Sequence, residues 1–111
     1  MLVARSSPFG GKTRTRVLLA LGLLSESYPR ELARVLETSL NGVQEALKGL
    51  EIDGIVSGRS AGRTRLFRLN PRYFAFEALR RYLLRLVEPE LELKKRIEEV
   101  RRRPRRTGKP L

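Results

Sequence analysis

Apolar residues in the first half of the chain recur at the spacing of three consecutive amphipathic helices. The first is expected over 13–24, with one buried face made by positions i, i+1, i+4 and i+7. The second covers 29–36, because the proline at its first position suits the first turn of a helix. The third occupies 39–53, where Ser39 is a favourable N-cap and Gly54 a favourable C-terminal stop. These stripes are made by Val17, Leu18, Leu21, Leu24, Leu32, Ala33, Leu36, Val43, Leu47 and Leu50.

The pattern changes after the third helix to that of a β-hairpin. A strand begins at 55–56, and in 64–69 the side chains of Phe67 and Leu69 share one face. The glycine-rich segment 58–63 between these strands is expected to form the turn.

Two further helices are expected in the last third of the chain. Asn70-Pro71 opens the first of them, Pro89 restarts or kinks the helical pattern, and Pro104 ends it. The last helix places acids four residues before bases, the favourable orientation for i,i+4 pairs. These pairs are Glu90 with Lys94, Glu92 with Arg96, Glu98 with Arg102 and Glu99 with Arg103. The predicted fold class is mainly α with a small β-hairpin (α+β).

Charge adds a candidate partner to this picture. The 111 residues carry 24 Lys and Arg against 12 Asp and Glu, a formal net charge of +12. Such a charge favours a polyanion, with nucleic acid first and an anionic membrane surface second. The charge is uneven, because 94–111 carries a net +7 whereas 26–53 carries a net −3. Bulk charge therefore says little about where a nucleic-acid sequence would be recognised.

The residue types that are missing exclude several functions. The chain has no Cys and no His, so it lacks a thiolate metal site, a cysteine nucleophile and the commonest general base. No apolar run reaches the ~18 residues of a membrane span. We therefore expect no enzyme, no metal and no cofactor, and a cytoplasmic, nucleoid-associated protein.

The order of elements fits a helix-turn-helix over 30–53 followed by a wing. Three stretches resemble prokaryotic winged helix-turn-helix transcriptional regulators of the ArsR/MarR type. They are Arg30-Glu31-Leu32-Ala33-Arg34, Val43-Gln44-x-x-Leu47-Lys48-x-Leu50-Glu51-x-x-Gly54-Ile55-Val56 and Gly62-Arg63-x-x-x-Phe67-Arg68-Leu69-Asn70-Pro71. The resemblance covers 12–87. It implies binding of double-stranded DNA as a homodimer, with the 39–53 helix in the major groove and the 57–69 hairpin as the wing.

Two groups of side chains are candidates for contacting DNA. On the third helix the apolar stripe faces the core, so Asn41, Gln44 and Lys48 lie on the opposite side, where Asn and Gln can read adenine. At the wing, Arg59 and Arg63 flank the tip with no acid nearby in sequence, which favours contact with phosphate or the minor groove. The predicted DNA-binding residues are Ser39, Asn41, Gln44, Lys48, Arg30, Arg59, Arg63, Arg65, Lys12 and Arg14.

Each of these assignments has a plainer alternative. Asn41 and Gln44 can be solvated polar residues, and Arg65 can be an ordinary strand-face residue. Lys12 and Arg14 are ambiguous between an arm that faces DNA and a solvated helix face.

The C-terminal helices predict a dimer surface, because they carry more apolar residues than one small core would take. The predicted dimerisation residues are Tyr82, Leu83, Leu86, Leu93, Ile97 and Val100. Dimerisation would place two recognition helices about 34 Å apart, one turn of DNA. The alternative is that these helices pack onto their own winged domain.

The predicted organisation is a flexible N-terminal arm over 1–11, a winged helix-turn-helix domain over 12–70, C-terminal helices over 71–103 and a basic, disordered tail over 104–111. The function favoured is a sequence-specific transcriptional regulator. Two alternatives stay open, a winged-helix adaptor that docks a partner protein and a binder of structured RNA. The net acidic charge of 26–53 supports the adaptor, and the basic tail is the one hint of RNA.

Overall fold

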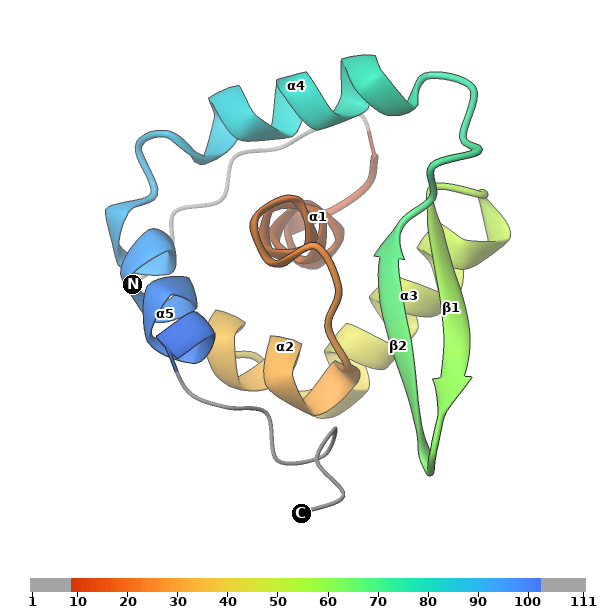
Figure 1. Ribbon diagram of the computed structural model, residues 1–111, viewed down its shortest axis with the longest axis horizontal. Helices are drawn as coiled ribbons and strands as arrows, with labels where there is room; N and C mark the ends of the chain where they lie inside the picture. Colours follow the sequence, from red (N-terminus) through yellow and green to blue (C-terminus); the bar gives the residue numbers. More distant parts are fainter. Residues whose placement is uncertain (1–8, 103–111) are drawn as a thin grey trace.

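The computed structural model describes residues 9–102, and the predicted arm and tail lie mostly outside this range. This range contains five helices and a two-stranded antiparallel sheet. The elements are α1 (Lys12–Leu24), α2 (Pro29–Leu36), α3 (Leu40–Ile52), β1 (Val56–Ala61), β2 (Thr64–Leu69), α4 (Phe76–Val87) and α5 (Leu91–Arg102). Figure 1 shows α1 end-on at the centre, with the other elements arranged around it.

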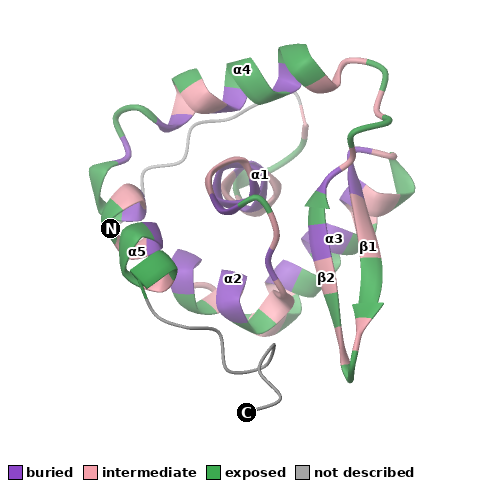
Figure 2. Cartoon of the chain, viewed as in Figure 1, coloured by how far each residue is buried: buried purple, intermediate pink, exposed green. Residues whose placement is uncertain are grey.

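Helix α1 forms the centre of the core. The sequence predicted one buried face, but all five residues from 17 to 21 have exposed fractions of 2% or less. Leu19 and Ala20, which lie off the predicted stripe, are among them. The reason is tertiary, because α4 and α5 pack against α1 in addition to α2, α3 and β2. Figure 2 shows the buried residues of α2, α4 and α5 on the sides that face α1.

The predicted helix-turn-helix is confirmed in α2 and α3. Helix α3 begins after Ser39, whose Oγ accepts a hydrogen bond from the N–H of Gly42 at 3.0 Å. Gly54 follows the end of α3 with φ of +78°, a conformation that glycine adopts without steric cost. Both ends of α3 therefore follow from local sequence signals.

Strand β1 is longer, and the turn is shorter, than the sequence predicted. Strand β1 continues through Ala61, which pairs with Thr64, so the turn contains only Gly62 and Arg63. The expectation of a turn over 58–63 was wrong because cross-strand pairing overrides the weak strand preference of Gly and Ser. Gly62 has φ of +64°, as a tight two-residue turn requires.

A third extended segment holds the other edge of β2. Ser27, between α1 and α2, donates its N–H to the oxygen of Phe67 at 3.0 Å and accepts from the N–H of Phe67 at 2.7 Å. The Oγ of Ser27 also donates to Oε1 of the buried Glu31 at 2.7 Å. These bonds fix the base of the hairpin to the start of α2.

Helix α4 begins at Phe76 rather than at Asn70-Pro71. The side chain of Asn70 instead forms turn contacts, accepting from the N–H of Arg72 at 3.0 Å and donating to the oxygen of Gly54 at 2.9 Å. The restart at Pro89 is confirmed, because α4 ends at Val87 and α5 begins at Leu91. Pro104 lies outside the described residues.

The C-terminal helices fold back onto their own domain. Leu83, Leu93 and Ile97 have exposed fractions of 1%, 0% and 2% within the single chain, and Leu86 and Val100 are partly buried against the same core. The expectation that these residues exceed what one core can take was wrong, because α1 offers buried surface on every side. Tyr82 remains 39% exposed, with its ring 6.1 Å from that of Phe9.

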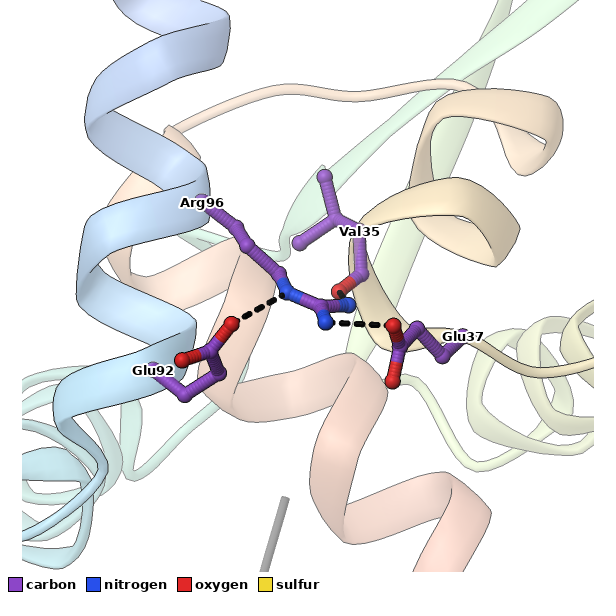
Figure 3. Close-up of polar contacts among 4 residues, drawn as sticks. All are labelled: Val35, Glu37, Glu92 and Arg96. Carbon is purple, nitrogen blue, oxygen red and sulfur yellow. Dashed lines mark hydrogen bonds and ion pairs between the residues drawn. The ribbon is translucent and has the colours of Figure 1, made fainter. Parts of the chain in front are cut away.

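Helix α5 is attached to the end of α2 through one arginine (Figure 3). Arg96 donates to the carbonyl oxygen of Val35 at 3.2 Å, to Glu92 at 3.2 Å and to Glu37. Glu37 sits just past the end of α2 with φ of +54°. Its interaction with Arg96 holds the pKa of the Glu37 carboxyl below the usual 4.5. Of the predicted i,i+4 pairs, Glu92 with Arg96 is thus observed.

Among residues 9–102, no helix has both the length and the apolar character needed to cross a membrane.

Candidate nucleic-acid interface

The outer face of α3 carries the polar residues that the sequence placed there. Asn41, Gln44, Glu45 and Lys48 are all exposed, whereas Val43, Ala46, Leu47 and Leu50 are buried. Ser39 is exposed too, but its hydroxyl is engaged as the N-cap of α3. The helix therefore presents donors and acceptors of the kind that read base edges in a major groove.

A groove of about 400 Å³ lies between this face of α3 and the hairpin. It brings together four of the predicted DNA-binding residues, Gln44, Lys48, Arg63 and Arg65. Its lining is Pro29, Gln44, Leu47, Lys48, Glu51, Arg63, Thr64, Arg65 and Phe67. Helix and wing thus form one concave surface.

Arg65 crosses this groove and binds α3. Its Nη1 donates to Oε1 of Glu51 at 3.1 Å and its Nη2 donates to Oε2 at 2.8 Å, a bidentate pair. The guanidinium also stands over the ring of Phe67, 4.9 Å from the centroid. The bonds from Arg65 hold the pKa of Glu51 below the usual 4.5, and the same bonds raise the pKa of Arg65.

Arg59 is also paired, although no acid lies near it in the sequence. Its Nε and Nη2 donate to the two carboxylate oxygens of Glu26, at 3.0 and 3.2 Å. This hydrogen bonding raises the pKa of Arg59. The absence of acids around the wing in sequence was real, but Glu26 comes from the loop before α2, 33 residues away. Tertiary folding therefore brings a carboxylate to each of two wing arginines and compensates their positive charges.

The side chain of Arg14 forms hydrogen bonds within the protein rather than projecting into solvent. Its Nη1 donates to Oδ2 of Asp53 at 3.0 Å and to the oxygen of Phe9 at 3.4 Å. The side chain crosses α3 at Gly49, where an added Cβ would lie 2.0 Å from Nη2 of Arg14. Lys12 and Arg30 are exposed at the first turns of α1 and α2, outside the lining of the groove, although Arg30 follows the lining residue Pro29.

Two cations in the groove have no acidic partner in the part of the chain that the structure describes. Within residues 9–102, neither Lys48 nor Arg63 takes part in an ion pair. Both side chains are exposed, Lys48 on α3 and Arg63 in the turn of the hairpin. They are therefore the residues of this surface that are best placed to meet an anion.

Sequence reasoning missed the carboxylates that organise this surface. In the sequence, Glu51 stands out only within a stretch that resembles the winged-helix regulators, and Glu26 only adds to the net acidic charge of 26–53. No local signal marks either residue as a partner of the wing. Gly58 bears on the wing arginine alone, because it lies directly across from Phe67 and leaves the space through which Arg65 passes.

In the described part of the chain, no cluster of acidic residues has the grouping needed to hold a metal ion. The surface offers hydrogen-bond donors, hydrogen-bond acceptors and cations.

No family model matches the chain, and no curated protein matches it. A solved structure does match it, that of the adhesin competence repressor AdcR from Streptococcus pyogenes. The two chains share 18% identity with a TM-score of 0.60, and the match covers 81% of this chain and 66% of that one. This likeness, together with the five helices and the hairpin, shows a winged-helix fold. The chain matches just under two thirds of the length of the AdcR chain.

Proposed function

We propose that this chain is a transcriptional regulator of the ArsR/MarR type that binds specific sequences of double-stranded DNA. Helix α3 enters the major groove, and the hairpin of β1 and β2 acts as the wing. The observation that carries the proposal is the groove in which the exposed face of α3 and the wing tip meet. The likeness in fold to a protein named as a repressor supports it.

The chemistry of the surface divides into base reading and phosphate binding. Asn41 and Gln44 project from α3 with side-chain amides that can each make two hydrogen bonds to adenine. Lys48 and Arg63 supply positive charge in the same groove as Gln44, and their contacts with phosphates would fix the register of the protein on the duplex. Glu45, exposed on the same face, disfavours a close approach to phosphate.

Selection from a random library of duplexes tests the proposal and yields the site at the same time. Binding to the selected duplex and to an unrelated duplex is then followed by fluorescence anisotropy over a range of salt. Arg63→Ala should weaken both duplexes alike and reduce the salt slope by about 0.9, the loss of one phosphate contact. Gln44→Ala should change the preferred sequence and leave the slope unaltered.

Arg81→Ala is the matched control, because Arg81 is exposed on α4, outside the groove lining. It removes the same charge as Arg63→Ala and should leave the salt slope unchanged. No binding of the wild-type chain to any duplex at about 50 mM salt, where phosphate contacts are strong, would refute the proposal.

We also propose that the protein acts as a homodimer, so that two copies of α3 meet successive turns of DNA. Of the six predicted dimerisation residues, Tyr82, Leu86 and Val100 keep part of their surface available. Light scattering with and without a palindromic duplex measures the stoichiometry. A single chain per selected site would argue against the dimer.

A second candidate function is a winged-helix adaptor that docks a basic segment of another protein. The observation that favours it is the net −3 charge of 26–53, together with the pairing of Arg59 and Arg65 by glutamates. This alternative predicts no binding to duplex DNA, so the same salt titration separates the two functions.

A further inference from the structure

The bond between Arg65 and Glu51 connects the wing to the proposed recognition helix. We propose that this pair sets the distance between α3 and the hairpin, and that Glu51 and Arg65 are positioning residues for duplex recognition rather than DNA contacts. The inference rests on the proposed function and specifies how that surface is held.

Two side chains hold the guanidinium of Arg65, and a glycine leaves room for it. Glu51 takes two of its N–H groups, at 3.1 and 2.8 Å, which fixes both the position and the plane of the group. The ring of Phe67, 5% exposed, lies beneath it. On the third side Gly58 leaves the necessary room, because a Cβ there would stand 2.6 Å from Nη2 of Arg65.

The position of this pair along the hairpin explains why it controls the wing. Directly opposed residues of an antiparallel pair lie on the same face, so Gly58 and Phe67 share a face with Ser60 and Arg65. That face looks toward α3. Phe67 lies in the core and its backbone is bonded to Ser27, so the base of the hairpin is already fixed. Arg65 lies two residues closer to the tip, and its bonds to Glu51 attach this outer part of the hairpin to α3.

The same bond determines which cations are available to DNA. Arg65 has its charge compensated by Glu51 across the groove, whereas Lys48 and Arg63, within the described residues, have no acidic partner. Loss of the Glu51 charge would release Arg65 toward the duplex and remove a nearby negative charge. Electrostatic attraction would then rise while the geometry of helix and wing loosened.

Glu51→Gln tests these two consequences together. Binding to an unrelated duplex should become tighter, with a salt slope steeper by about 0.9, because one more cation reaches phosphate. The ratio of affinities for the selected and the unrelated duplex should fall about three- to tenfold, in the range of coupling between contacting residues. Arg65→Lys should also lower this ratio, because lysine cannot form the bidentate pair.

Glu77→Gln provides the matched control. Glu77 is exposed on α4 and its oxygen lies 3.8 Å from Nε of Arg80, so the change removes one acid from a surface ion pair outside the groove. It should alter neither the salt slope nor the affinity ratio. Thermal unfolding of each variant confirms that the domain is still folded at the temperature of the binding measurement.

A measurement without DNA separates this inference from the proposed function. Because the chain has no cysteine, Glu45→Cys on α3 and Ala61→Cys on β1 give two unique sites for spin labels. The distance distribution between the labels should broaden in Glu51→Gln and stay narrow in Glu77→Gln.

Three results would overturn the inference. The first is an unchanged distribution of label distances in Glu51→Gln, and the second is a lower ratio of affinities for the selected and unrelated duplexes with that distribution unchanged. The third is a decrease of about 0.9 in the salt slope for Arg65→Gln. The last would show that Arg65 itself binds phosphate. If the wild-type chain binds no duplex, the proposed function fails and so does the recognition role of the pair, whereas the label distances still report whether the pair fixes the wing.

Discussion

Arg59, on the outer part of β1, is held by both carboxylate oxygens of Glu26 in the loop that precedes α2. The two residues are 33 positions apart, and Arg59 is 61% exposed while Glu26 is 31% exposed. The wing is thus attached to the domain on this face as well as on the face that carries Arg65.

Glu26→Gln should strengthen binding to duplexes of any sequence. Removal of the carboxylate releases Arg59 for phosphate, so we expect a salt slope steeper by about 0.9. Anisotropy titrations with an unrelated duplex at several salt concentrations measure this slope. Glu88→Gln, which removes an exposed acid at the end of α4, serves as the control. An unaltered slope in Glu26→Gln would mean that Arg59 does not reach the DNA.

Stability should decrease at acid pH through Glu51 and Glu37. Hydrogen bonds from Arg65 and Arg96 lower the pKa of these carboxyls below the usual 4.5 in the folded chain. Their stabilisation is therefore complete above the unfolded pKa and is lost as the pH falls through the folded pKa. The melting temperature should fall as the pH is lowered from about 6 to about 3, and this fall should be smaller in Glu51→Gln than in the wild-type chain. An identical pH dependence in the variant would contradict the assignment to Glu51.

Two glycines that accommodate arginines should respond differently to alanine. A Cβ at position 58 would stand 2.8 Å from Cε2 of the buried Phe67, so Gly58→Ala should destabilise the fold by about 1–3 kcal/mol. At position 49 the Cβ meets only the far end of the long Arg14 side chain, which can shift, and alanine favours the helix by about 0.8–1.0 kcal/mol. Gly49→Ala should therefore leave stability unchanged or slightly higher. Denaturant unfolding of both variants measures the free energy of unfolding. Equal decreases in this free energy for the two variants would refute the distinction.

Leu93→Ala tests whether α5 belongs to the core of the single chain. The side chain is 0% exposed, so its truncation should cost about 2–5 kcal/mol in the free energy of unfolding. Because the contacts are within one chain, the loss should not depend on protein concentration. A loss that shrinks as the concentration rises would instead place Leu93 in a dimer interface.

The sequence predicted those features whose signals are local. Helix α3 could be placed from its apolar spacing, the Ser39 cap and the Gly54 stop, and the structure confirms all three. The break between α4 and α5 followed from Pro89 in the same way. The exposed face of α3 was predicted as well, because the core-facing stripe leaves one side for Asn41, Gln44 and Lys48.

What the sequence could not predict depends on contacts between distant segments. The pairing of Arg59 with Glu26 and of Arg65 with Glu51 spans 33 and 14 positions, and no periodicity encodes it. The same reason explains the burial of Leu83, Leu93 and Ile97, since the space available around α1 appears only once the chain has folded. The length of β1 was missed because Gly58 and Ser60 favour a turn locally but are paired across the hairpin.

The central position of α1 makes the domain one cooperative unit. Helices α2, α3, α4 and α5 and strand β2 all pack on this helix, so none of them can detach without exposing it to water. Amide hydrogens of residues 17–21 should accordingly exchange only through global unfolding, whereas those at the hairpin tip exchange through local opening. Destabilising substitutions in any of the surrounding elements should therefore speed the exchange of the amide hydrogens of α1.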